Sequence, residues 1–330
     1  MSTRCHAVGL DEAPHAYRRL PDVLSTQRGA VEVLHTLRPL IVGWPTRTGP
    51  TLRAAGYGLR ASGTTYQDNK AMQGQLPGII RKHEKFAAES IEPRDVHVYL
   101  PPGYGTSPTQ RFPVLYLHDG QNLFDPTTAF REDWKVDSTA ESLIQKGEVE
   151  PMIIVGIANS GEKRIDEYTP TKDEARQKGG EAEKYGRMLI SELKPFIDRL
   201  YRTRPDPANT GLGGSSLGGL ITLHLGLRHS SVFGKLAVLS PSVWWDSRGI
   251  IHEVVALTSK LPLRIWLDAG TGEGPDVTTD ARMLRDALVA KGWKVDDDLK
   301  YFEAEGAEHN ERAWGSRVDR VLKYLFPKQA

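Results

Sequence analysis

The chain has 330 residues, with 43 lysines and arginines against 42 acidic residues and a single cysteine. This charge balance gives no basic stripe for nucleic acid, and one cysteine excludes an intrachain disulfide and a cysteine-rich zinc site. We find no secretory signal and no apolar run of about 18 residues, so we expect a soluble, cytoplasmic protein with no membrane partner. The oligomeric state is not indicated.

Residues 1–78 follow no regular pattern. Arginine, glycine, threonine and proline recur there, and the apolar residues have no clear period. Segments 45–50 and 56–63 are typical of loops because glycine and proline interrupt regular structure. We therefore expect a flexible or loosely docked extension, followed by a catalytic domain over residues 79–330.

From residue 79 onward, short apolar runs alternate with helical patterns. The predicted strands are 95–100, 113–118, 152–157, 209–212, 235–240, 263–268 and 299–302. The predicted helices are 137–145, 181–201, 217–229, 279–291 and 312–325. Strands that alternate with helices of this length indicate right-handed crossovers, so we predict an α/β fold with a mainly parallel central sheet and helices on both faces.

A glycine-rich motif lies between the strand at 209–212 and the helix at 217–229. Its core, Gly214-Ser215-Ser216-Leu217-Gly218, fits G-x-S-x-G, the nucleophile elbow in which a sharp strand-to-helix turn exposes a serine hydroxyl. Glycines on both sides tolerate the dihedral angles that such a crowded turn requires. The motif predicts Ser216 as a nucleophile. The alternative is a glycine- and serine-rich loop without chemistry.

Partners for this serine follow later strands, because ligands of an open parallel sheet bind at the carboxyl ends of its strands. His309 follows the last predicted strand, and Glu273 lies in a glycine-rich loop after the strand that ends at Asp268. A histidine can take the serine proton, while an acid orients the imidazole and stabilises its protonated form. We assign His309 as the base and Glu273 as the acid. The competing acids are Asp268, which can be structural, and Asp276 and Asp280, which can cap the following helix.

An oxyanion hole for this chemistry needs two backbone N–H groups. Leu217, the residue after the nucleophile, supplies one of them. Gln121 supplies the other, because it follows the strand at 113–118 and Gly120 allows the backbone to turn toward the serine. The alternative is a plain tight turn in which Asp119 binds its own backbone.

Further residues near the expected cleft are candidates for substrate binding. Trp244 and Trp245 follow a predicted strand and can form an apolar wall, or else complete the core. Arg164 can bind an anionic substrate group, or pair internally with Asp166 or Glu167. Asn122, in the same loop as Gln121, completes this set.

Taken in order, these segments resemble the putative-esterase family of α/β-hydrolases. That family includes siderophore, feruloyl and acetyl-xylan esterases, S-formylglutathione hydrolase and the mycolyltransferases. The resemblance covers about residues 80–327. The matching segments are VHVYLPPGY (96–104), LYLHDGQNLFD (115–125), 159–170, GGSSLGG (213–219), SPSVWW (240–245), DAGTGE (268–273) and EHN (308–310).

The resemblance implies a serine esterase of the α/β-hydrolase fold that needs no cofactor or metal. Carried over, it makes Ser216 the nucleophile, His309 the base, Glu273 the acid, and Leu217 and Gln121 the oxyanion donors. The expected substrate is a small soluble ester: an acyl sugar, a feruloyl ester, a siderophore or a simple short-chain ester. An acyltransferase using the same triad and a catalytically silent binding module are the alternatives.

Overall fold

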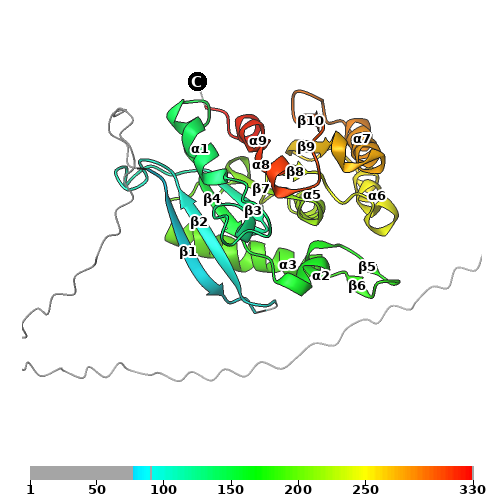
Figure 1. Cartoon of the computed structure of the whole chain (residues 1–330), viewed down its shortest axis with the longest axis horizontal. Coiled ribbons are helices and arrows are strands. Elements are labelled where there is room, and N and C mark those ends of the chain that lie inside the picture. The colour runs from blue at the N-terminus through cyan, green and yellow to red at the C-terminus, as the bar shows by residue number, and fades with distance from the viewer. Residues whose placement is uncertain (1–76, 90, 329–330) are drawn as a thin grey trace, which may run out of the picture. The chain divides into compact units, whose positions relative to one another are not determined.

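A single mixed sheet organises the part of the chain that the structure describes. The computed structural model describes residues 77–89 and 91–328, so nearly all of the extension expected at 1–78 lies outside the described residues. The sheet has eight strands in the order β1-β2-β4-β3-β7-β8-β9-β10 (Figure 1). Its strands are β1 (Ile79–Phe86), β2 (Arg94–Leu100), β3 (Val114–His118), β4 (Ile153–Ile157), β7 (Thr210–Ser215), β8 (Lys235–Leu239), β9 (Arg264–Gly270) and β10 (Leu299–Ala304).

The strands from β4 to β10 in that order run parallel, whereas β1 and β2 join antiparallel at one edge. The prediction of an α/β fold with a mainly parallel sheet is therefore confirmed. Parallel strands place all their carboxyl ends at one edge of the sheet, where a ligand site forms. The loops after β3, β7, β8, β9 and β10 consequently meet at that edge.

Helices cover both faces of the sheet, as predicted. They are α1 (Val136–Gln145), α2 (Arg164–Tyr168), α3 (Ala182–Arg187), α4 (Lys194–Leu200), α5 (Leu217–Arg228), α6 (Gly249–Ala256), α7 (Pro275–Lys291), α8 (Glu311–Gly315) and α9 (Val318–Leu325). One face packs against α1 and α9, and the other against α5 with α6 and α7 beside it (Figure 1).

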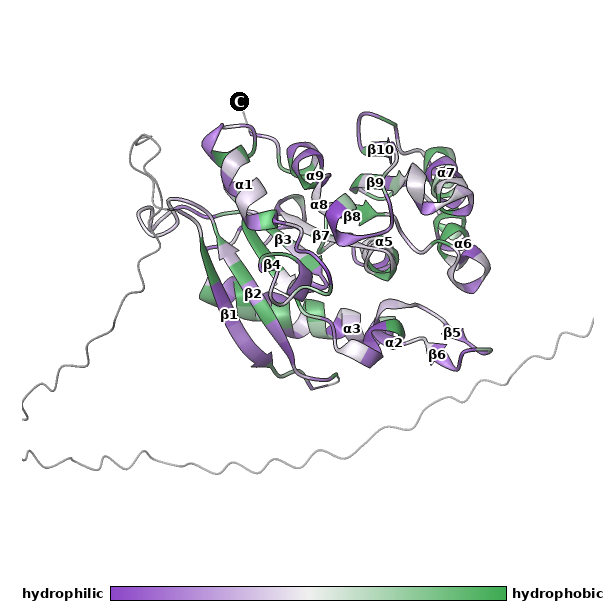
Figure 2. Ribbon diagram, in the orientation of Figure 1, coloured by the Kyte–Doolittle hydropathy of each residue, from purple (hydrophilic) through white to green (hydrophobic). Residues whose placement is uncertain are grey.

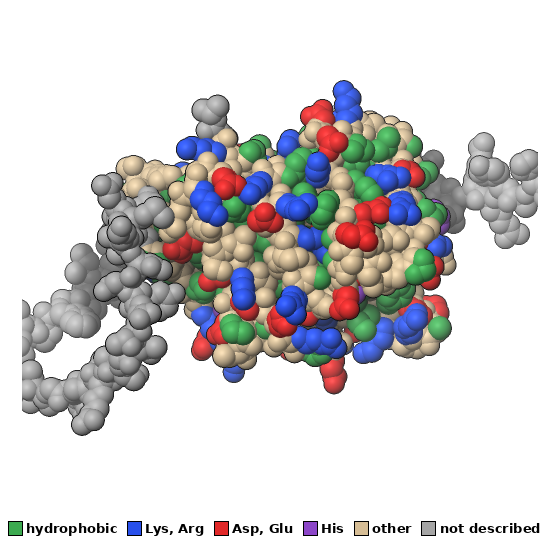
Figure 3. All heavy atoms as spheres, turned by 45° about the horizontal axis from the view of Figure 1, so that its top comes forward, with side chains coloured by type: hydrophobic (Ala, Val, Ile, Leu, Met, Phe, Trp, Pro, Cys, Tyr) green, Lys and Arg blue, Asp and Glu red, His purple; other side chains and the backbone are tan. Residues whose placement is uncertain are grey.

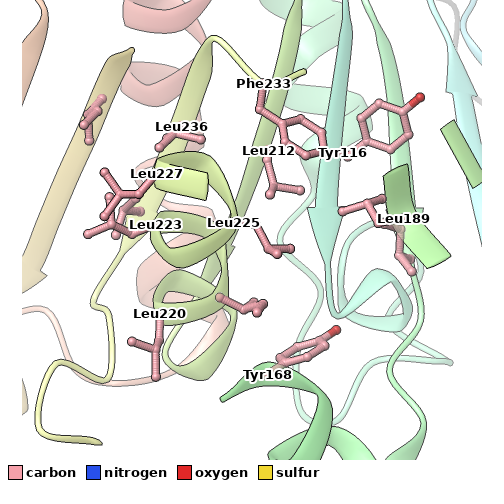
Figure 4. Packing of buried hydrophobic residues seen from close by; sticks show 14 of the residues in the cluster. Tyr116, Tyr168, Leu189, Leu212, Leu220, Leu223, Leu225, Leu227, Phe233 and Leu236 are labelled. Atoms are coloured by element: carbon pink, nitrogen blue, oxygen red, sulfur yellow. The ribbon is translucent and has the colours of Figure 1, made fainter. Parts of the chain in front are cut away.

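Alternation along β3 divides the core between these two faces. Val114 and Tyr116 belong to the cluster on the α5 side, whereas Leu115 and Leu117 belong to the cluster on the α1 and α9 side. Successive side chains of a strand point to opposite faces, so a strand covered on both sides must be apolar throughout. Figure 4 shows Tyr116 and its neighbours packed in the first of these clusters.

The sequence patterns missed elements that bury little surface or lack a clear period. β1 was not predicted because its residues are largely exposed and charged, which makes it the hydrophilic edge strand of Figure 2. The short α6 and the two-residue strands β5 (Lys172–Asp173) and β6 (Lys178–Gly179) were also missed. The single helix expected over 181–201 is interrupted by a π-helical segment, η3 (Met188–Leu193), between α3 and α4.

The surface carries both signs of charge. On the face shown in Figure 3, basic and acidic side chains are interspersed. None of the helices in the described ranges has an apolar stretch long enough to cross a membrane.

Two adjacent valines on α6 test the packing of this core. Val254 is fully buried, whereas Val255 is 59% exposed. We expect Val254→Ala to lower the free energy of unfolding by about 2 kcal/mol, because it leaves a cavity in the core. Val255→Ala is the matched control and should change it by less than about 0.5 kcal/mol. Urea denaturation measures both, and equal costs would contradict the assigned burial of α6.

Candidate active site

Ser216 lies in a strained turn between β7 and α5. Its backbone adopts φ 59° and ψ −123°, which a residue with a β-carbon rarely occupies. The turn is held by neighbours: Ser216 N–H donates to Leu239 O at 3.1 Å, and Ser242 N–H donates to Ser216 O at 3.0 Å. A β-carbon on Gly219 would lie 2.9 Å from Leu239 O, so a glycine is needed for α5 to start this close to β8. The strand, turn and helix required for a nucleophile elbow are all present.

His309 and Glu273 form a hydrogen-bonded line with Ser216. His309 Nε2 lies 3.0 Å from Ser216 Oγ, and His309 Nδ1 lies 2.6 Å from Glu273 Oε2. With Glu273 ionised, Nδ1–H donates to the carboxylate, which leaves Nε2 free to accept the serine proton. The structure thus brings together the three side chains that the sequence analysis grouped, from the elbow and from the loops after β9 and β10.

The carboxylate of Glu273 is fully enclosed and well supplied with donors. Its Oε1 accepts from Ser240 Oγ at 2.5 Å and from Gly270 N–H at 2.8 Å. Burial alone would raise the pKa of Glu273, but the hydrogen bonds from His309 and Ser240 outweigh it and hold this pKa below its ordinary value. Glu273 therefore stays ionised at neutral pH.

Ser240 connects Glu273 to a second buried acid, Asp268. Besides donating to Glu273, the Ser240 hydroxyl lies within hydrogen-bond distance of Trp314 Nε1 and Arg317 Nη2, at 3.1 Å and 3.0 Å. Arg317 also pairs with Asp268 through two contacts of 3.1 Å. Burial raises the pKa of Asp268 despite that pairing. The sequence analysis gave no role to Ser240 or Arg317, although Ser240 is the last residue of the predicted strand 235–240.

The remaining acids do not bind His309. Asp268 faces Arg317 and the indole N–H of Trp266, 2.7 Å from its Oδ2. Asp280 pairs with Arg248 at 2.6 Å instead of capping a helix. Asp276 lies in the first turn of α7 and lines a small cavity near His309. Within the described part of the chain, Glu273 is the carboxylate hydrogen-bonded to His309.

The loop after β3 carries Gln121 in a short 3₁₀ turn, η1 (Gly120–Asn122). A β-carbon on Gly120 would lie 2.4 Å from the backbone of Gly156, so the loop rests directly on β4. Gln121 and Ser216 line the same cavity. Leu217 is the first residue of α5, and amides in the first turn of a helix have no partner within that helix.

Arg164 holds the loop after β3 in place by binding Asp119. Its guanidinium binds both oxygens of Asp119, with Nε–Oδ1 at 2.7 Å and Nη2–Oδ2 at 2.8 Å. Of the two alternatives for Arg164, the internal pair is the one present, but its partner is Asp119 and not Asp166 or Glu167. Glu167 instead binds the buried Arg94. Burial alone would raise the pKa of Asp119, but the charge and hydrogen bonds of Arg164 outweigh burial and hold this pKa below its ordinary value, so the pair is ionic.

Two cavities adjoin His309, and the larger one also adjoins Ser216. The larger, of about 550 Å³, is lined by Gln121, Asn122, Phe130, Arg164, Glu311 and Trp314 among others. The smaller, of about 270 Å³, is lined by Ser242, Trp244 and Asp276 among others. Phe130 and Glu311 were not expected from the sequence, since neither belongs to a recognisable motif.

The two tryptophans expected near substrate occupy different environments. Trp244 is 50% exposed and lines the smaller cavity. Trp245 is only 3% exposed, and its indole N–H donates to Thr171 O at 3.1 Å. The expectation that Trp245 contacts substrate is corrected on this basis, because its side chain completes the core.

A model of the family described as "Putative esterase" matches residues 89–325. The uncharacterized protein YbbA of Bacillus subtilis is 27% identical over 70% of this chain and 92% of its own length. An endo-1,4-beta-xylanase/feruloyl esterase of Xylanibacter ruminicola is also 27% identical. That match covers 76% of this chain and 31% of the enzyme's own length.

Among solved structures, the enterobactin esterase FES of Shigella flexneri, crystallised in the presence of enterobactin, has the same fold. Its TM-score is 0.62 at 21% identity, and the match covers 76% of this chain and 60% of FES.

His118, at the end of β3 beneath the Gln121 loop, gives a pH-dependent prediction. Burial lowers the pKa of His118 from 6.5 to about 3. In the unfolded chain His118 therefore becomes protonated near pH 6.5, whereas in the folded chain it stays neutral at that pH. The contribution of His118 to the free energy of unfolding is therefore fully present above pH 6.5 and is lost as the pH decreases. At pH 5 the loss is about 2 kcal/mol.

Between pH 7.5 and pH 5, we expect the free energy of unfolding of His118→Asn to decrease by about 2 kcal/mol less than that of the wild type. Urea titrations at the two pH values measure the difference. His252→Asn is the control, because His252 is exposed. An unchanged pH dependence in His118→Asn would show that His118 is not the buried neutral group.

Proposed function

Because this chain belongs to the Putative esterase family and is a carboxylic ester hydrolase, we propose that it acts through an acyl-enzyme formed on Ser216. The observation that carries the proposal is the continuous line from Ser216 through His309 to Glu273, with contacts of 3.0 Å and 2.6 Å. Such a line activates a serine that is otherwise a weak nucleophile at neutral pH.

In the first half of the reaction, Ser216 Oγ attacks the ester carbonyl carbon while His309 Nε2 takes its proton. The negative oxygen of the tetrahedral intermediate accepts hydrogen bonds from the backbone N–H groups of Leu217 and Gln121. Glu273 stabilises the imidazolium through the Nδ1–H bond. The carbon–oxygen bond to the leaving group then breaks, and His309 protonates the departing alcohol.

In the second half, water replaces the alcohol. His309 takes a proton from the water as its oxygen attacks the acyl carbon, and then returns a proton to Ser216 Oγ. The products are a carboxylic acid and free enzyme, so no cofactor is consumed. The same two amides hold the second oxyanion.

The proposed substrate is a small-molecule ester that fits beside the exposed Trp244. The names of similar proteins point to feruloyl esters and to siderophores such as enterobactin, and acyl sugars and short-chain esters belong to the same chemistry. An aromatic side chain at the cleft can pack on an aromatic acyl group or a sugar ring.

Labelling by a fluorophosphonate tests the nucleophile. We expect the folded wild type to form one covalent adduct on Ser216, located by mass spectrometry of peptides, and to lose hydrolysis of p-nitrophenyl acetate in proportion. Ser215→Ala should still be labelled, whereas Ser216→Ala should not. Absence of an adduct in folded wild-type protein would overturn the acyl-enzyme proposal.

A second prediction concerns the acid. We expect Glu273→Gln to lower kcat for p-nitrophenyl acetate by at least about tenfold, because the neutral amide stabilises the imidazolium poorly. Glu308→Gln, an exposed neighbour of His309, is the control and should leave kcat unchanged. If Asp276→Asn lowered kcat more than Glu273→Gln did, the acid would be wrongly assigned.

A further inference from the structure

We propose that Glu311 makes the larger cavity selective against anionic ester groups and in favour of uncharged or cationic ones. The inference rests on the proposed function and narrows its substrate class. The inference is based on which charged side chains line the two cavities and on which of them are paired within the protein.

Arg164 is not a free cation, because a buried carboxylate already offsets its charge. It is the positive side chain among the residues that line the larger cavity, and both oxygens of Asp119 already bind it. Asp119 also accepts from Asn159 Nδ2 at 2.7 Å. A substrate anion that bound Arg164 would lie close to the carboxylate of Asp119, so the pair offers an anion little net attraction.

Glu311 adds a second carboxylate to the same cavity, and this one is poorly partnered. Its side chain lines the cavity although the residue is only 8% exposed. Among the described residues, its recorded hydrogen bond is a long one, from Asn122 Nδ2 to Glu311 Oε1 at 3.5 Å. A carboxylate can accept about four hydrogen bonds, so Glu311 keeps free acceptor sites beside the cavity.

A substrate group can supply the missing partners. A hydroxyl, an amide N–H or an ammonium group beside Glu311 would donate to its free acceptor sites, and the charge-assisted bond would be strong. A carboxylate in the same place would instead meet a like charge in a partly desolvated cavity, which provides discrimination by repulsion.

The smaller cavity does not reverse this charge pattern. Asp276 and Asp280 line it, and Arg248 neutralises Asp280 alone. Arg176 lies over the ring of Trp244, but it is paired with Asp173. The lining of the cleft as a whole therefore carries more carboxylates than unpaired cations.

Glu311 could instead be structural, by holding Asn122 next to Gln121, or could act only by stabilising the His309 imidazolium. Either role predicts that losing the charge changes all substrates by the same factor. A specificity role predicts a change that depends on the charge of the substrate. The two are separated by comparing esters that differ in charge alone.

The experiment uses two matched sets of esters. For the acyl side, these are p-nitrophenyl esters of butanoate, hemisuccinate and 4-(trimethylammonio)butanoate. For the alcohol side, acetylcholine is compared with its neutral isostere 3,3-dimethylbutyl acetate. In the set whose variable group enters the larger cavity, we expect the wild type to have a kcat/KM roughly tenfold lower for the anionic ester than for the neutral one, or roughly tenfold higher for the cationic ester.

Glu311→Gln should reduce that ratio to within about twofold of unity while changing the neutral ester much less. Glu311→Asp, which keeps the charge, should retain the preference, and Glu308→Gln should leave it unchanged. Equal ratios in wild type and Glu311→Gln, or a uniform loss on every ester, would overturn the inference.

Binding separates this inference from the proposed function. The dissociation constants of the same esters for Ser216→Ala, measured by calorimetry, report the charge preference without turnover. If wild type failed to hydrolyse any ester, the proposed function would fail, but the binding ratios would still test Glu311. Hydrolysis with no charge preference in rate or binding would overturn the inference alone.

Discussion

The enclosed carboxylate of Glu273 is the constraint on which the site depends. A buried charge is tolerated only when donors surround it, and here they come from separate parts of the chain: Ser240 after β8, Gly270 at the end of β9, and His309 after β10. Each of these donors is positioned by a strand of the parallel sheet. The hydrogen bonds that keep Glu273 ionised therefore also align His309 with Ser216.

A second ion pair organises the opposite side of the cleft. Arg164 and Asp119 bind each other through two contacts, and Asp119 precedes the turn that carries Gln121. Asp119 therefore neutralises Arg164, a residue that the sequence alone offers as a binding group for an anionic substrate. With Arg164 neutralised, Glu311 decides the charge character of the larger cavity, so loop architecture and selectivity are linked by the same side chains.

Much of the fold was predictable because the buried parallel strands are apolar throughout and so are easily recognised. The elbow at Ser216 was predictable for a similar reason, since its glycines are required by a crowded backbone. The edge strand β1 was not, because an exposed charged strand lacks the apolar pattern of its neighbours. The sequence left open whether Trp245 contacts substrate or completes the core, and it did not indicate Asp119 as the partner of Arg164. Both outcomes depend on segments distant in sequence.

The sequence by itself determined the fold class, the family and the order of serine, acid and histidine along the chain, because these depend on local patterns of residue type and spacing. Only the tertiary structure decided which acid meets His309, since Asp268 ends the predicted strand 263–268, and Glu273 and Asp276 come just after it. It also decided that Arg164 is neutralised and that Glu311 is left under-partnered. Contacts of this kind join residues far apart in the sequence, and no local pattern records them.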